Sequence, residues 1–168
     1  ALSLLRRFKK PIPDVFRDEV MNPIGASTTW KWVPYTNAYV EIDGKRMASV
    51  SGGTRWGGGM WINSDDMARF GLLWLRGGAW GGRQIVSPAY VKAATTPSAH
   101  GPDYGFLWWL NTKQGWAGTP ATAYRAVGNG GNIIFIAPSH DLVVVWRWGA
   151  QSAEGFSKVV EAVTSPSR

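Results

Sequence analysis

The seven residues at positions 126–132, AVGNGGN, have a composition that suits catalysis by backbone groups. Three of them are glycine, and they lead directly into the apolar run IIFIAP. An oxyanion hole needs a backbone N–H about 3 Å from the reacting oxygen, and side chains would obstruct that approach. A tight turn or a β-bulge would explain the same glycines without any chemistry. The residues alone leave both interpretations open.

Two other groups of residues have catalytic types but the wrong arrangement. Ser139, His140 and Asp141 are the residue types of a hydrolase triad, but consecutive residues cannot align nucleophile, base and orienting carboxylate. We therefore interpret them as a turn. Asp65 and Asp66 could act as paired carboxylates, but they fall in the first turn of a predicted helix. The helix dipole favours negative charge there, which favours a structural role.

The printed sequence contains no recognisable nucleophile. No serine is followed by lysine three positions later, the S-x-x-K spacing in which an amine can activate a hydroxyl. There is no G-x-S-x-G motif and no phosphate-binding P-loop. Tyr35-Thr36-Asn37 matches Y-x-N, a box that accompanies S-x-x-K in some hydrolases. With no cysteine and only two histidines, we expect no metal site, and we expect no cofactor.

The elements that must position these residues fall into two parts. Residues 1–103 are predicted to be mainly helical, with irregular loops rich in glycine and tryptophan, and residues 104–168 to form antiparallel strands and a C-terminal helix. We expect the two parts to belong to one incomplete catalytic domain. This order of elements predicts a mixed α/β chain of the α+β type.

Capping and turn residues set the expected elements of the first part. Its helices are expected at 1–9, at 13–22 with Pro13 in the first position, from the N-cap Ser64 to Gly77–Gly78, and from the N-cap Ser87 to Pro97. A strand pair is expected at 39–42 and 46–50, joined by Asp43-Gly44. Residues 23–62 are otherwise expected to be irregular.

The second part shows β-type runs. YGFLWWLN, from residue 104, predicts a strand in which one of Trp108 and Trp109 is buried, because adjacent side chains point to opposite faces. IIFIAP and LVVVWRW predict an antiparallel hairpin. SAEGFSKVVEAV predicts a final helix that covers the sheet.

Bulk properties narrow the class of protein. The 168 residues are 45% apolar and 17% charged, which suits a packed core, and no apolar run is long enough to span a membrane. The net charge of +7 is mostly dispersed, so we expect no nucleic-acid partner. The one basic cluster, Arg6, Arg7, Lys9 and Lys10, is interpreted as a solvated helix face. The chain begins at Ala1, so we expect its natural start upstream, and the sequence assigns no compartment.

The order of motifs resembles the C-terminal half of the penicillin-recognising serine hydrolases. The similarity is closest to class C β-lactamase-like esterases and amidases, including 6-aminohexanoate-dimer hydrolases. The opening ALSLLRRFKKPIPDVFRDEVMNPIGAS resembles the helix pair that follows the tyrosine box in that family. The other matching motifs are GGGMWINSDDMARFGLLWLRGG, SPAYVKAATTP, YGFLWWLN and AVGNGGNIIFIAPSHDLVVVWRW. The resemblance implies part of a β-lactamase/transpeptidase-like fold.

The resemblance also implies roles for the glycine-rich stretch. The family's K-T-G box aligns with Ala126-Val127-Gly128, so Asn129 would donate its backbone N–H to the oxyanion hole. Ala126, Val127, Gly128 and Gly130 would form the substrate-binding edge. The S-x-x-K and tyrosine boxes would lie upstream of Ala1, which leaves the Tyr35 motif too late in the chain to be that box.

This sequence departs from K-T-G in two positions. Ala126 replaces the lysine and Val127 the hydroxyl residue, which in β-lactamases help to hold the substrate carboxylate and support proton transfer. The replacement disfavours β-lactam hydrolysis and favours small-molecule ester or amide substrates, which could carry an apolar or aromatic portion in view of the tryptophans. Arg125 could supply the lost cation, but on a strand it should face away from the side that Ala126 faces.

Two functional hypotheses follow. The first is the C-terminal part of a serine hydrolase that acts through an acyl-enzyme and is inactive without the N-terminal segment of the same protein. The alternative is a non-catalytic binding module, in which some of the eleven tryptophans line a cleft for peptides or glycans.

Overall fold

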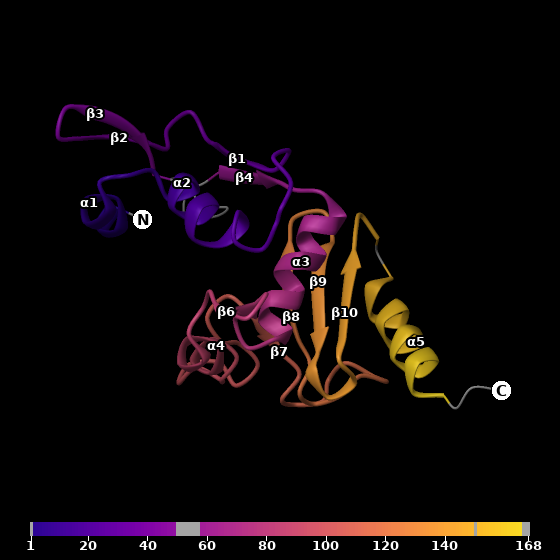
Figure 1. Ribbon diagram of the computed structural model, residues 1–168. Coiled ribbons are helices and arrows are strands. Elements are labelled where there is room, and N and C mark those ends of the chain that lie inside the picture. The colour runs from indigo at the N-terminus through magenta and orange to yellow at the C-terminus, as the bar shows by residue number, and fades with distance from the viewer. Residues whose placement is uncertain (1, 50–57, 150, 166–168) are drawn as a thin grey trace. The chain divides into compact units, whose positions relative to one another are not determined.

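The computed structural model describes residues 2–49, 58–149 and 151–165 (Figure 1). Its internal contacts divide the chain into an N-terminal unit, Ala1–Asp66, and a C-terminal unit, Met67–Arg168. The division at residue 103 that the composition suggests stays a prediction.

Two helical segments open the N-terminal unit, as the sequence predicts. Helix α1 spans Leu2–Phe8, and α2 spans Ile12–Phe16 and continues as a π-helical turn over Arg17–Met21. The second helix begins at Ile12, so Pro13 is its second residue, one position later than expected. Proline is tolerated there because the first backbone N–H groups of a helix have no partner within it.

Two antiparallel strand pairs complete this unit. Strands β2 (Tyr39–Ile42) and β3 (Lys45–Ala48) form the predicted hairpin, with Asp43-Gly44 as its two-residue turn. Strands β1 (Lys31–Pro34) and β4 (Gly58–Trp61) also pair. Residues 50–57, part of the stretch expected to be irregular, lie outside the described residues.

The helix predicted from its first-turn aspartates is α3, Ser64–Leu75. The expected cap is wrong by one position. Asn63, not Ser64, caps the helix, because its Oδ1 accepts a hydrogen bond from the Asp66 backbone N–H at 2.7 Å. The next helix, α4, spans Pro88–Ala94 as expected, and Ser87 Oγ accepts from the Tyr90 N–H at 3.2 Å.

A four-stranded antiparallel sheet dominates the C-terminal unit (Figure 1). The strand order is β10-β9-β8-β7, and a β5–β6 pair (Ala79–Trp80 with Arg83–Gln84) lies outside it. The predicted hairpin is confirmed, whereas the strand expected in YGFLWWLN shortens to two residues. The strands are β7 (Trp109–Leu110), β8 (Tyr124–Gly128), β9 (Asn132–Ala137) and β10 (Leu142–Trp146).

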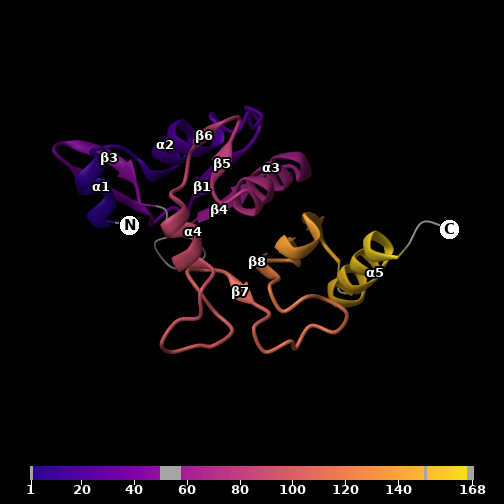
Figure 2. The ribbon, with the colours of Figure 1, turned by 60° about the horizontal axis from the view of Figure 1, so that its bottom comes forward.

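Helices pack against both faces of this sheet (Figures 1 and 2). Helix α5 (Ser152–Thr164) is the predicted covering helix, and its Phe156 ring stacks on Phe135 of β9 with centroids 4.6 Å apart. Helix α3 packs on the other face, where a Cβ on Gly71 would lie 2.8 Å from Ile134 Cγ2. The expected split of the tryptophan pair is confirmed, because Trp108 is 4% exposed and Trp109 44%.

Candidate functional site: the open end of strand β8

Strand β8 is paired on both sides at its beginning and on one side at its end. Strand β7 contacts only Tyr124 and Arg125, whereas β9 pairs with β8 as far as Gly128. Among the described residues, no strand pairs with the outer edge of Ala126, Val127 and Gly128. The stretch predicted to bind substrate therefore lies on a sheet edge that is open to added hydrogen bonds.

The edge leads directly into a tight hairpin turn of three residues, 129–131. Gly130 and Gly131 both have a φ of +73°, a left-handed conformation that glycine adopts without strain. Asn132 Nδ2 donates to the Asn129 carbonyl oxygen at 2.7 Å, which fixes the first peptide of the turn. The tight turn thus accounts for two of the glycines.

The backbone N–H of Asn129 is not used by this turn. Within the described part of the chain it donates to no acceptor, and Asn129 itself is exposed. A backbone donor held at the end of a strand and left unpaired is what stabilisation of a developing oxyanion requires. The predicted substrate-binding residue Gly130 follows it directly and is also exposed.

The chain that follows β10 packs against the same turn. A Cβ on Gly130 would lie 2.3 Å from Cζ3 of the Trp148 ring, and one on Gly131 would lie 2.9 Å from the Gly149 carbonyl oxygen. Gly130 is therefore needed both for its backbone angle and for the close approach of Trp148. Sequence reasoning missed this contact, because no local pattern links residues 130 and 148.

The side chain of Arg125 lies on the opposite face of the sheet from that of Ala126, as the alternation along a strand predicts. Its register partner is Phe135, which packs on α5, whereas Ala126 pairs with Ile134, which packs on α3. The Arg125 guanidinium lies 4.1 Å from the centroid of the Trp116 ring, and burial lowers its pKa. Arg125 therefore cannot take the place of a lysine at Ala126.

The Ser139-His140-Asp141 tripeptide forms a turn and not a triad, as predicted. The neighbouring side chains of Ser139 and His140 do meet, with Oγ and Nδ1 2.9 Å apart. The Asp141 carboxylate pairs instead with Arg76 at 2.9 Å, because the left-handed backbone of Asp141 ends the short 3-10 helix Pro138–His140. Without an orienting carboxylate on His140, the three residues do not form a triad.

Asp66 has a structural role that the sequence suggested only in part. Its carboxylate is fully buried and accepts hydrogen bonds from the Ser27 N–H at 2.9 Å, from the Ser27 hydroxyl at 2.6 Å and from Asn63 Nδ2 at 3.0 Å. Helix-dipole reasoning placed Asp66 correctly in the first turn of α3. It could not reveal that a loop 39 residues earlier is tied to the same carboxylate.

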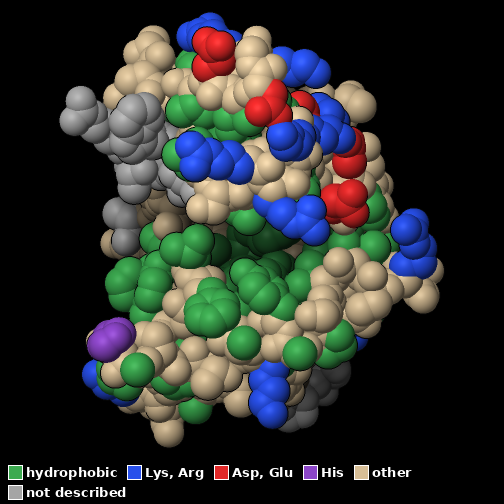
Figure 3. All heavy atoms as spheres, turned by 90° about the vertical axis from the view of Figure 1, so that its left-hand side faces the viewer, with side chains coloured by type: hydrophobic (Ala, Val, Ile, Leu, Met, Phe, Trp, Pro, Cys, Tyr) green, Lys and Arg blue, Asp and Glu red, His purple; other side chains and the backbone are tan. Residues whose placement is uncertain are grey.

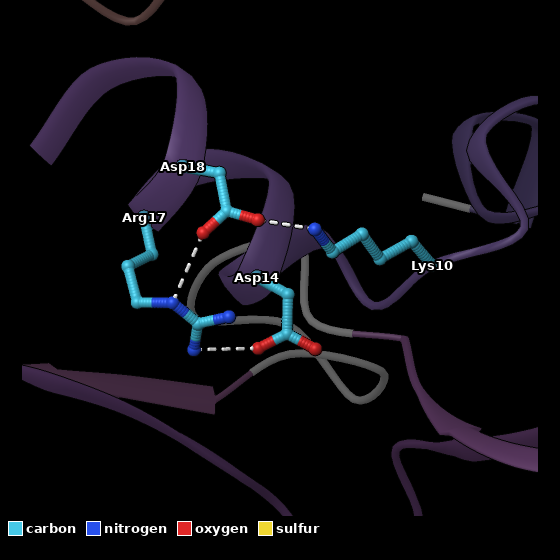
Figure 4. A network of polar contacts seen from close by, with 4 residues as sticks. All are labelled: Lys10, Asp14, Arg17 and Asp18. Carbon is cyan, nitrogen blue, oxygen red and sulfur yellow. Dashed lines mark hydrogen bonds and ion pairs between the residues drawn. The ribbon is translucent and has the colours of Figure 1, made fainter. Parts of the chain in front are cut away.

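Several charges of the N-terminal unit form ion pairs, among them Lys9 with Asp43 and Lys10 with Asp18. Figure 3 shows Lys and Arg side chains interspersed with Asp and Glu over this unit. Lys10 pairs with Asp18 and lowers the pKa of that carboxyl, and Arg17 binds Asp14 at 2.8 Å (Figure 4). The interpretation of the basic cluster as a solvated face agrees with this pairing.

Other features of a site are sparse. A depression of about 450 Å³ lies in the C-terminal unit, and Trp80 is the one tryptophan in its lining. The lining residues are Leu72, Arg76, Ala79, Trp80, Gly81 and Gly82. The described residues hold no group of three or more side chains suited to a metal ion. No described helix is both long enough and apolar enough to cross a membrane.

Comparison with known proteins decides the family. A family model described as Beta-lactamase matches residues 4–151. The chain belongs to the β-lactamase family. An uncharacterized protein of Alkalihalophilus pseudofirmus is 29% identical over an alignment of 114 residues, and the match covers 61% of this chain and 34% of that protein. The chain thus spans about a third of the length of this relative.

Solved structures of similar fold agree with membership of the β-lactamase family. A β-lactamase from Mycobacterium bovis has a TM-score of 0.64 at 20% identity, over 96% of this chain and 60% of that one. A candidate 6-aminohexanoate-dimer hydrolase from Bacillus anthracis has a TM-score of 0.52 at 21% identity, over 74% and 33%. These likenesses confirm an α+β chain with part of a β-lactamase-like fold.

Proposed function

We propose that this chain is the C-terminal part of a serine hydrolase that cleaves small esters or amides through an acyl-enzyme. One observation carries the proposal: the open edge of β8 ends at a backbone N–H, that of Asn129, which no described group accepts. Membership of the β-lactamase family supports a hydrolase of this class.

In the proposed reaction, a serine from the preceding segment of the protein attacks the substrate carbonyl. The carbonyl oxygen becomes negatively charged, and the Asn129 N–H and the N–H of that serine donate hydrogen bonds to it. The serine hydroxyl gives up its proton to the neighbouring lysine as it attacks, the C–O or C–N bond then breaks, the leaving alcohol or amine takes that proton, and an acyl-enzyme forms. Water attacks this ester in turn, which releases the acid and restores the serine.

The side chains on the open edge support esters or amides over β-lactams. Ala126 and Val127 offer neither a cation nor a hydroxyl for a substrate carboxylate. The nearest cation in sequence, Arg125, lies on the opposite face against Trp116. Ala126, Val127, Gly128 and Gly130 are proposed to line the substrate through backbone and apolar contacts.

The proposed partner is the preceding segment of the same protein. Strand β10 ends the sheet, so its outer edge has no strand partner among the described residues. An open edge of five residues, LVVVW, favours pairing with another strand. We propose that the preceding segment supplies this strand together with the S-x-x-K serine and lysine and the tyrosine box.

The experiment compares this chain with the complete protein that contains it, using 4-nitrophenyl acetate. We expect the complete protein to release nitrophenol in a reaction that a serine-directed phosphonate abolishes, and the 168-residue chain alone to be inactive. Turnover by the chain alone, abolished by the phosphonate, would contradict the location of the nucleophile. No turnover of any ester or amide by the complete protein would contradict the hydrolase itself.

A further inference from the structure

Trp148 is held in a conformation that its own packing does not explain. Its φ is +56°, in the left-handed region that strains the backbone of a bulky residue. The side chain is nevertheless 72% exposed, so this strained backbone does not lead to burial in the core. Backbone strain at a residue whose side chain stays largely exposed is a reason to look for function.

The neighbouring Trp146 shows what a structural tryptophan looks like at this end of β10. Its ring packs edge to face on Phe156, with centroids 5.9 Å apart, and a Cβ on Gly155 would lie 2.4 Å from it. Trp146 is therefore a packing residue between the sheet and α5. Trp148, two residues later, has its ring on the glycine turn instead.

The ring of Trp148 lies on Gly130, the residue that follows the proposed oxyanion donor Asn129. The position where a Gly130 Cβ would stand is 2.3 Å from Cζ3 and 2.6 Å from Cε3 of Trp148, so the ring touches the peptide that follows Asn129. A carbonyl bound to the Asn129 N–H would thus lie one residue from a turn position that carries an exposed aromatic ring. Aromatic side chains offer large apolar contact areas at small entropic cost.

We propose that Trp148 is a specificity-determining residue that contacts the acyl group of the substrate and favours flat, apolar acyl groups. This inference rests on the proposed function and adds the substrate class to it: esters or amides of aromatic acids over those of acetic acid. Gly130 makes the arrangement possible, since any larger residue would displace the ring.

The test uses the complete protein and two esters with the same leaving group, 4-nitrophenyl benzoate and 4-nitrophenyl acetate. The measured quantity is the ratio of their kcat/KM values. We expect Trp148→Ala to lower this benzoate-to-acetate ratio about tenfold, within the range that apolar contacts in a binding site give. Trp148→Phe should keep most of the ratio, because it keeps a flat ring.

Trp109→Ala is the matched control, because Trp109 is also a partly exposed tryptophan of this sheet but lies on β7. It should leave the ratio unchanged. The inference would be overturned if Trp148→Ala had the same benzoate-to-acetate ratio as the unaltered protein. This includes the case in which Trp148→Ala and Trp148→Phe lose activity equally towards both esters. No turnover of any ester or amide by the unaltered protein would contradict the hydrolase function, and this inference with it.

Discussion

The two ends of strand β8 differ in almost every physical respect. Tyr124 is 6% exposed, pairs with strands on both sides, and meets the Trp108 ring edge to face with centroids 5.1 Å apart. Val127, three residues later, is 47% exposed and pairs on one side only. The first end holds the sheet together, whereas the second offers backbone groups and little packing.

One short strand can thus combine a stabilising end with the end that we propose to be catalytic. The buried end fixes the register, because a slip by one residue would turn Tyr124 and Ala126 out of the face on which they pack. Because the buried end fixes the register, the open end is held in position without needing buried contacts of its own. Substitutions at the two ends should therefore affect different measurements.

The largest effect is expected at the buried end. Tyr124→Ala should lower the free energy of unfolding by about 3–5 kcal/mol, since it removes a buried aromatic ring and leaves a cavity. Val127→Ala is the matched control and should change it by less than about 0.5 kcal/mol. Urea denaturation of both variants measures the difference, and equal losses would show that the two ends do not differ in this way.

The next effect is expected in activity at the open end. Asn129→Pro removes the proposed oxyanion donor and should lower kcat/KM of the complete protein by about 10²–10³-fold, the cost of losing one such donor. Asn129→Ala keeps the backbone N–H and should change kcat/KM little. Ester turnover measures both, and equal activity of the two variants would contradict the role of this N–H.

A smaller effect is expected where the turn meets Trp148. Gly130→Ala should destabilise the fold by about 1–3 kcal/mol, because it strains a residue at positive φ and also pushes on the tryptophan ring. Gly44→Ala is the control for strain alone, since Gly44 has a φ of +72° but no atom within 4 Å of its Cβ position. Thermal unfolding should show the larger loss for Gly130→Ala, and a larger loss for Gly44→Ala would contradict the Trp148 contact.

The smallest effect is expected in the pH dependence of stability. Burial raises the pKa of Tyr124, so the folded state keeps the phenol neutral after the unfolded chain begins to ionise near pH 10. The stability that this group contributes is present below that pH and is lost as the pH rises further. Tyr124→Phe should therefore show a shallower fall in unfolding free energy between about pH 9 and 11 in urea titrations. An identical fall in both proteins would show that this phenol does not contribute.

Local sequence signals predicted the elements well and their limits less well. The cap at Ser87, the Asp43-Gly44 turn and the β9–β10 hairpin were each readable, because each depends on residues that are close in the chain. The N-cap of α3 was predicted at the wrong residue, since Asn63 and Ser64 are both good caps and only the hydrogen bond to Asp66 chooses between them. The strand in YGFLWWLN shortens because β8 accepts only two residues of it.

By itself, the sequence determined the helices, the hairpins and the family motifs, including the glycine-rich stretch that ends at Asn132. It also determined that Arg125 and Ala126 face opposite sides, which follows from strand alternation alone. Only the tertiary structure decided that the pairing of β7 with β8 stops at Arg125, that the Asn129 N–H finds no acceptor among the described residues and that Trp148 lies on Gly130. These features depend on which distant segments meet, and such meetings are set by packing and loop closure rather than by local preference.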